Sequence, residues 1–317
     1  MKRVVLCGYG RFGRVYAKRV VEHPDLELVG VVEVGRVQDE ARLDGFRAFD
    51  TLREALDVLC PSLVIVATPP ALHALLAIES LQRHVDVMLA KPGALSLDEA
   101  ERIAAVAWRM RRRVVVDHTP MMSPAWQRLK AQPWADGIIT ARFVRRGMQA
   151  YQDCGALWDW ASHDVALALD LDWRDRVKRV DARAWWYPDL PEPVGVFIHL
   201  THTSGRVSRI EVDWLAADTE RRVEVVEFQR MHVWDQLADR VGWTNRGYRL
   251  DDYGDIIGVW DLQPDLHPVM GDGRDNVTRA LSRAISGADD TERLLEVTRV
   301  LSEAEMALYA ATENGAV

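Results

Sequence analysis

Short apolar runs alternate with amphipathic stretches along the first 120 residues of the chain. This alternation is typical of a parallel sheet, because each strand is buried on both faces while each connecting helix buries only one. Helix starts are indicated at Thr51 with Glu54 and at Ser96 with Glu99, which have the spacing of capping boxes. We therefore expect an α/β domain with a doubly wound parallel sheet over residues 1–120, with strands at 4–7, 26–32, 63–67, 85–89 and 114–116.

The pattern changes after residue 120, where strict alternation of apolar and polar positions becomes the dominant signal. Long strands are predicted at 178–187, 194–203, 207–215 and 221–228, after a shorter one at 138–144. Ser204-Gly205 has the composition of a hairpin turn. Helices are predicted at 124–130, 158–171 and 275–311, the last of them broken near Gly287. Residues 121–317 are therefore expected to form an α+β domain with a large, mostly antiparallel open sheet.

Composition narrows the functional class. A length of 317 residues favours two domains, and a net charge of -8 without a basic run argues against nucleic-acid binding. The three cysteines are scattered, and there is neither a leader nor an apolar run long enough to span a membrane. The expected protein is a cytoplasmic enzyme with no membrane partner.

A glycine-rich motif follows the first predicted strand. It is Gly8-Tyr9-Gly10-Arg11-Phe12-Gly13, and Glu33 follows its last glycine by twenty positions, at the end of the second strand. The spacing predicts a Rossmann turn in which backbone N–H groups at a helix start face a pyrophosphate. Glu33 would bond the adenosine ribose and favour NAD over NADP, whereas Arg36 could reach a ribose phosphate and so leaves NADP open.

Polar residues at the carboxyl ends of the parallel strands should meet at one crevice. They are Thr68, Pro69, Lys91, Pro92 and His118. Lysine, unlike arginine, can have its pKa brought toward neutrality by burial, which suits proton-transfer chemistry. The alternative for Lys91 is a solvated side chain at a strand end.

Asp159 and His163 are four residues apart on a predicted helix and therefore on one face. A carboxylate beside an imidazole can orient it and raise its basicity, although a surface pair is the commoner explanation. His199 and His202 lie three apart on a predicted strand and so point to opposite faces, and no metal site is expected.

These motifs together resemble the Gfo/Idh/MocA family of dehydrogenases along essentially the whole chain. Beside the glycine motif, the resemblance rests on Ala67-Thr68-Pro69-Pro70 with His73, on Ala90-Lys91-Pro92, and on Asp159-Trp160-Ala161-Ser162-His163. It implies that His73 and Pro92 belong to the cofactor site, that the Lys91–Pro92 peptide is cis, and that Lys91, His163 and Asp159 are catalytic. Ala90 and Ala161 depart from the glutamate and glycine that are usual in the family.

The resemblance further implies hydride transfer between nicotinamide and a secondary alcohol or ketone carbon of a sugar, nucleotide sugar or cyclitol. Expected substrate-binding residues are His118, Arg142, Arg145, Trp158 and Asp164, although the arginines, with Arg146, could equally form a solvated strand end. A homodimer or homotetramer through the second sheet is expected. Two alternatives remain open, a cofactor-binding regulator that has lost catalysis and an imine or enone reductase.

Overall fold

The structure is a computed structural model that describes residues 1–134, 137–149, 154–250, 253, 256–260, 265–269 and 275–313. Within these ranges, residues 36–38, 43, 246–250, 256–260, 265 and 311–313 are described by their backbone alone. The chain divides into two compact units. The first is Met1–Thr119 with Arg274–Arg299, and the second is Pro120–Gly273 with Val300–Val317. The sequence pattern placed residues 274–299 with the second part of the chain, whereas here they belong to the first unit.

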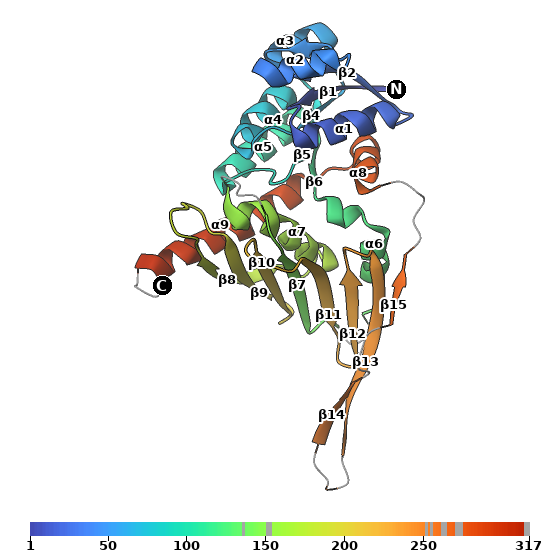
Figure 1. Cartoon of the computed structure of the whole chain (residues 1–317), viewed down its shortest axis with the longest axis vertical. Coiled ribbons are helices and arrows are strands. Elements are labelled where there is room, and N and C mark those ends of the chain that lie inside the picture. The colour runs from blue at the N-terminus through green and yellow to red at the C-terminus, as the bar shows by residue number, and fades with distance from the viewer. Residues whose placement is uncertain are drawn as a thin grey trace. The chain divides into compact units, whose positions relative to one another are not determined.

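The first unit contains a six-stranded parallel sheet in the order β3-β2-β1-β4-β5-β6 (Figure 1). The strands are β1 Lys2–Cys7, β2 Leu26–Val32, β3 Ala48–Phe49, β4 Leu63–Val66, β5 Asp86–Ala90 and β6 Val114–Asp117. Every neighbouring pair is parallel, which confirms the doubly wound sheet. The order reverses between β1 and β4, and in such sheets ligands bind at this point, beyond the carboxyl ends of the strands.

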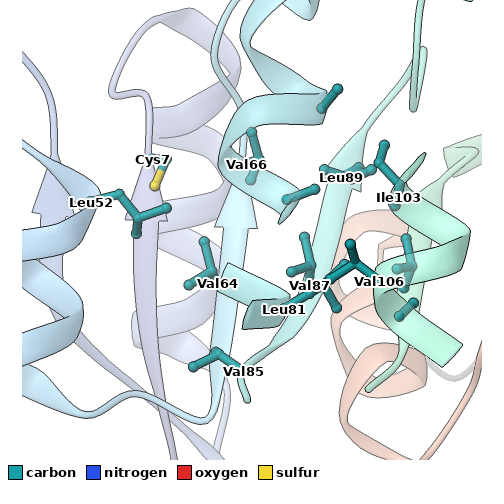
Figure 2. Packing of buried hydrophobic residues seen from close by; sticks show 14 of the residues in the cluster. Cys7, Leu52, Val64, Val66, Leu81, Val85, Val87, Leu89, Ile103 and Val106 are labelled. Atoms are coloured by element: carbon teal, nitrogen blue, oxygen red, sulfur yellow. The ribbon is translucent and has the colours of Figure 1, made fainter. Parts of the chain in front are cut away.

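Helices connect these strands and bury their apolar faces against the sheet. They are α1 Arg11–Glu22, α2 Gly35–Leu43, α3 Leu52–Leu59, α4 His73–Gln82 and α5 Leu97–Met110, with short 3-10 turns at Pro70–Leu72 and Thr119–Met122. Both expected caps are present, because Thr51 accepts from Glu54 N and Ser96 accepts from Glu99 N. Figure 2 shows Val64 and Val66 of β4 in the same buried cluster as Leu81 of α4.

Two C-terminal helices, α8 Asn276–Ile285 and α9 Thr291–Glu313, follow the second sheet in sequence. The segment between them lies along the outer edge of β6, where Asp290 N donates to Val114 O at 2.6 Å and Val116 N donates to the Asp290 carboxylate at 3.2 Å. Lys2 Nζ donates to Ile285 O at 2.8 Å, and α8 lies beside α1 (Figure 1). The tail therefore satisfies backbone groups that an edge strand would otherwise expose.

The second unit is built on a nine-stranded sheet in the described part of the chain, in the order β14-β13-β12-β11-β7-β10-β9-β8, with β15 paired to β13. The strands are β7 Thr140–Arg146, β8 Val177–Trp185, β9 Gly195–His202, β10 Val207–Asp213, β11 Glu220–Val226, β12 Arg230–Asp235, β13 Arg240–Leu250, β14 Ile256–Trp260 and β15 Asp265–Pro268. All neighbouring pairs are antiparallel except β7 with β10. The antiparallel open sheet and the β9–β10 hairpin are thus confirmed, and β12 to β15 were not anticipated.

Helices pack against this sheet. They are α6 Pro124–Lys130, the π-helical turn η3 Leu157–Ala161 and α7 Ser162–Leu171. The sequence pattern predicted one uninterrupted α-helix over 158–171, whereas the structure widens its first turn into a π-helix. Such turns are rare and occur frequently at functional sites. Among the described residues, no helix has the length and apolar content that crossing a bilayer requires.

Candidate functional site

The three motif glycines between β1 and α1 differ in what surrounds them. Gly8 has φ +93°, and a Cβ added there would lie 2.6 Å from Ala67 O. A Cβ on Gly13 would lie 2.1 Å from Gly8 O, so the helix can pack on the strand only with glycine at this position. Gly10 has open space where its Cβ would be, and α1 begins directly after it without a side-chain cap. The first N–H groups of α1 are therefore suited to bind an anion.

Glu33 lies beside this turn. Its carboxylate accepts from Tyr9 N at 2.8 Å and from Val34 N at 3.0 Å, which fixes the carboxylate between the ends of β1 and β2. The Tyr9 hydroxyl donates to Asp44 at 2.6 Å, and burial followed by this carboxylate raises the pKa of Tyr9 to about 12. The glycine turn and the acidic residue thus come together as the sequence predicts. The side chain of Arg36 lies outside the described residues.

The loops after β4 and β5 are joined by His73. Its Nδ1 lies 2.8 Å from Pro92 O and its Nε2 lies 3.0 Å from Thr68 O, and the ring has no exposed surface. Burial lowers the pKa of His73, so the ring is neutral at physiological pH. Since both ring nitrogens contact backbone carbonyls, the geometry favours a role in holding the two loops together over direct contact with a cofactor.

Lys91 stands at the end of β5, and its peptide bond to Pro92 is cis, as the resemblance implied. The Lys91 side chain is partly buried, and its positive charge acts on Asp117 and His118 at the end of the neighbouring strand β6. The ammonium of Lys91, the carboxylate of Asp117 and the imidazole of His118 therefore lie close enough to influence one another electrostatically. Pro69, by contrast, is exposed on the loop after β4.

Asp117 was not singled out by the sequence motifs, although it directly follows the apolar run of β6. Its carboxylate accepts from the Tyr16 hydroxyl at 2.5 Å and from Thr119 Oγ1 at 3.1 Å. Burial raises the pKa of Asp117 to about 6, against the opposing effects of these hydrogen bonds and of Lys91. Burial, followed by the charge of Arg293, lowers the pKa of His118 to about 3, so this imidazole is neutral.

In the second unit, the π-helical turn η3 and the start of α7 contain the other expected catalytic residues. Asp159 is buried in η3, and His163 is partly buried in the first turn of α7. Trp158 is also buried, and its Nε1 donates to the Glu305 carboxylate of α9 at 2.9 Å. Hydrogen bonds in a π-helix join residues i and i+5, so the α-helical spacing assumed for Asp159 and His163 does not hold within η3. Lys91 and His163 belong to different units.

Arg142 and Arg145, both expected at the substrate site, lie on opposite faces of β7. Arg145 is 3% exposed and makes a two-point ion pair with the fully buried Asp164, at 2.9 Å from Nε and 2.9 Å from Nη2. Arg142 points to the other face, where its ion pairs with Glu211 and Glu224 are 3.0 and 3.7 Å long. The structure thus separates these arginines, because three positions along a strand reverse the side-chain direction.

A cavity of about 510 Å³ lies over β8, β9, β10 and β7 in the second unit. Arg142, Phe197, His199 and Arg209 are among its lining residues, and all of them belong to the face opposite Arg145. His202 points the other way and is buried against Ser208, which confirms that the two histidines face opposite sides. This cavity therefore lies away from the face on which Arg145 meets Asp164.

The residues around the glycine turn fit a dinucleotide. The start of α1 offers N–H groups, Gly10 leaves room above them, and Glu33 stands at the end of β2. Thr68, after β4, has a buried hydroxyl without a hydrogen-bond partner among the described residues, as expected where a ligand completes the site. Arg11 and Phe12 are exposed at the start of α1.

Three comparisons relate the chain to known proteins. Residues 2–118 match the Gfo/Idh/MocA model, described as an oxidoreductase family with an NAD-binding Rossmann fold. The chain is 30% identical to glucose-6-phosphate 3-dehydrogenase of Bacillus subtilis (strain 168) over 112 residues, which are 35% of this chain and 31% of that protein. It is 24% identical to UDP-N-acetylglucosamine 3-dehydrogenase of Acidithiobacillus ferrooxidans over 275 residues, 83% of each.

The solved structure of the Acidithiobacillus ferrooxidans enzyme superposes with a TM-score of 0.81 at 18% identity, covering 98% of both chains. This similarity extends the shared fold over both units. Residues 2–118 are therefore similar to the NAD-binding Rossmann domain of the Gfo/Idh/MocA oxidoreductases.

Proposed function

We propose that this protein is an NAD-dependent dehydrogenase that interconverts a secondary alcohol and a ketone on a sugar, nucleotide sugar or cyclitol. The observation that carries the proposal is the uncapped start of α1 at Gly10, with the Glu33 carboxylate held on Tyr9 N beside it. The relatives named above are dehydrogenases of a sugar phosphate and of a nucleotide sugar, which supports the substrate class. NAD, when bound, supplies the hydride acceptor or donor.

Lys91 would bind the reacting oxygen and stabilise the negative charge that develops there during oxidation. Its position after β5, at the carboxyl edge of the sheet, supports this role. His163 would take the hydroxyl proton as a general base and return it in the reverse direction. Asp159, in the turn before His163, would orient the imidazole or hold a neighbouring substrate hydroxyl.

Glu33 supports NAD over NADP as the preferred cofactor. Its carboxylate is fixed by two backbone N–H groups and keeps lone pairs for ribose hydroxyls. A phosphate on the same ribose would meet this negative charge at close range. We therefore expect NADH to bind more tightly than NADPH.

The test is a fluorescence titration with NADH and NADPH, followed by an assay of hydride transfer on glucose 6-phosphate, UDP-N-acetylglucosamine and myo-inositol. His163→Asn should lower kcat by roughly 100-fold or more, because general-base catalysis contributes 10²–10⁴-fold. Lys91→Met should lower kcat/KM by a similar factor. The matched controls are His84→Asn and Lys178→Met, since both side chains are exposed.

The outcomes separate the proposal from its alternatives. Tight NADH binding with no turnover on any of these substrates would favour a cofactor-binding regulator. Turnover that His163→Asn leaves intact would favour reduction of an imine or a conjugated double bond. Equal affinity for NADH and NADPH would contradict the role given to Glu33.

We also propose that the protein assembles as a homodimer or homotetramer through the sheet face that carries Arg142. Phe197 on this face is 50% exposed, and its ring lies tilted against that of Trp185, at 5.1 Å between ring centroids. Near it, Arg142 is paired with Glu211 and Glu224 on the same face. Analytical ultracentrifugation of the wild type and of Phe197→Glu tests this, and a wild-type monomer would contradict it.

A further inference from the structure

Three donor-bearing side chains stand in a row on the second sheet, on the face that carries Arg145. Arg145 of β7 and Arg221 of β11 are register partners, so their side chains point to the same face. Gln236, directly after β12, donates from its backbone N to Arg221 O at 2.9 Å. Its side-chain Oε1 accepts from Arg145 Nη2 at 3.2 Å. The three residues are therefore immediate neighbours.

The row and Asp164, the partner of Arg145, together carry one more positive than negative charge. Both oxygens of Asp164 are used by Arg145, in a pair that is buried on both sides. Arg221 is partly buried, its guanidinium lies 5.8 Å from the Trp160 ring centroid, and no carboxylate forms an ion pair with it among the described residues. Burial, followed by the charge of Arg145, lowers the pKa of Arg221, and the charge of Asp164 opposes this shift. A cation held in this way is costly unless an anion joins it.

The row also contains donors without acceptors. Because an arginine side chain can only donate hydrogen bonds, the group of Gln236 that contacts Arg145 must be the amide oxygen, Oε1. The amide nitrogen, Nε2, therefore points away from Arg145. Gln236 Nε2 and Arg221 Nε are both shielded from water and have no hydrogen-bond partner among the described residues. Buried donors left unsatisfied cost free energy, which a ligand bearing several oxygens would recover.

From this row we infer that Arg221 and Gln236, with Arg145 behind them, form a subsite for an oxyanion of the substrate, either a phosphoryl group or a carboxylate. The inference deepens the proposed function and rests on it for the rest of the ligand, which would be an acidic sugar. Trp160 and Asp164, which contact the row, directly follow Asp159 and His163 in sequence. The subsite thus shares the η3–α7 segment with the expected acid/base residue. Planar guanidinium and amide donors suit both anions.

The experiment uses the full chain saturated with NADH and measures sugar binding by calorimetry. The acidic probes are UDP-N-acetylglucosamine, glucose 6-phosphate and glucuronate, and the neutral references are N-acetylglucosamine and glucose. Arg221→Gln should weaken binding of the preferred acidic probe by about 10- to 100-fold, the loss expected for hydrogen bonds to a charged group. Gln236→Leu should weaken it by about 5- to 10-fold. The matched control is Arg222→Gln, whose arginine is already paired with Glu224 on the opposite face.

A second readout distinguishes binding from a structural role. Because Arg221 lacks a counter-ion among the described residues, Arg221→Gln should melt at or above the wild-type temperature without ligand. It should also lose the protection that the acidic probe gives the wild type. A melting temperature well below wild type would show that the guanidinium stabilises the fold, and would overturn the inference. The choice between UDP-N-acetylglucosamine, glucose 6-phosphate and glucuronate distinguishes diphosphate, monophosphate and carboxylate.

The inference is overturned if no acidic probe binds the wild type, if neutral sugars bind as tightly as their acidic counterparts, or if Arg221→Gln and Arg222→Gln behave alike. Binding that depends on Arg221 without any hydride transfer would support the subsite and reject the dehydrogenase. Turnover of neutral sugars that Arg221→Gln leaves unchanged would support the dehydrogenase and reject the subsite. The two proposals can therefore fail separately.

Discussion

At the scale of single residues, the glycine turn assigns distinct physical roles to positions that look alike in the sequence. Gly13 is required for packing, because an added Cβ would lie 2.1 Å from a backbone oxygen of Gly8. Gly10 adopts φ -69°, which any residue tolerates, and a methyl group added there would meet no other atom within 4 Å. Glycine at position 10 is therefore unnecessary for the fold, and its small size leaves space for a ligand.

Two alanine substitutions should separate these roles. Gly10→Ala should leave the free energy of unfolding within about 0.5 kcal/mol of wild type and weaken NADH binding by roughly 10-fold or more. Gly13→Ala should lower the free energy of unfolding by about 3 kcal/mol, since backbone clashes are relieved only by moving the helix. Urea unfolding and NADH fluorescence measure the two effects. Full NADH affinity in Gly10→Ala would contradict the assignment of the turn.

Asp117 should make the stability of the protein depend on pH in a defined window. Its pKa is about 6 in the folded state against 3.8 as the ordinary value, so the folded protein holds an extra proton between about pH 4 and 6. The free energy of unfolding therefore falls as pH rises through this window, by about 3 kcal/mol in all. The loss of stability that ionised Asp117 causes is absent below its ordinary pKa and complete above its pKa in the folded state.

Asp117→Asn removes this titration while keeping an acceptor for the Tyr16 hydroxyl. The variant should gain about 2–3 kcal/mol relative to wild type between pH 4.5 and pH 7.5, measured as the difference in urea unfolding free energy. The pKa of His118 is lowered to about 3, so its protonation in acid also reduces the free energy of unfolding. This effect is the same in the wild type and in Asp117→Asn and cancels in the difference. The exposed Asp98→Asn is the control, and a difference independent of pH would reject the assignment.

At the scale of elements, the predictions depend on how local each signal is. Strands β8 to β11 lie within two residues of their predicted bounds, because alternation and the Ser204-Gly205 turn are local signals. The π-helical turn at η3 was missed, since no local pattern distinguishes it from an α-helix. Alternation along β7 separates Arg142 from Arg145, because residues three apart on a strand point to opposite faces.

The pair between Arg145 of β7 and Asp164 of α7 joins a strand to a helix through buried charges. Asp164→Asn leaves Arg145 without a full counter-charge and should lower the free energy of unfolding by about 3–5 kcal/mol. The double variant Arg145→Met with Asp164→Leu should be less destabilised than Asp164→Asn alone, because no buried charge remains. A double-mutant cycle of Arg145→Met, Asp164→Leu and the double variant, measured by urea unfolding, gives the coupling, and additive effects would contradict this description.

At the scale of the whole molecule, the division into two units could be predicted near residue 120 but not near the C-terminus. The change from continuous apolar runs to alternation is visible in the sequence, whereas the return of 274–299 depends on contacts with β6, far away in the chain. The same holds for the site. Sequence motifs indicated the glycine turn, Glu33 and Lys91 as site residues. Asp117 and Arg221 belong to no motif, and only the residues around them in the structure suggest a role for them.

Asp290 should be the residue on which the returning segment depends most. It is 3% exposed, accepts from Val116 N, and forms ion pairs with Arg283 and Arg293. Asp290→Ala should lower the free energy of unfolding by about 3 kcal/mol or more, because it removes the buried carboxylate that accepts from Val116 N and pairs with Arg283 and Arg293. The exposed neighbour Glu292→Gln should change it by less than about 0.5 kcal/mol. Equal stability of the two variants in urea would contradict the role of the segment.

The position of His73 between two carbonyls has a consequence for how the crevice responds to a ligand. A neutral imidazole carries one ring proton, yet Thr68 O and Pro92 O each require one. The neutral ring can therefore donate to only one of the two carbonyls at a time, and exchange between its two tautomers alternates which carbonyl receives the hydrogen bond. Nitrogen chemical shifts of this single histidine would report which loop a bound nucleotide selects.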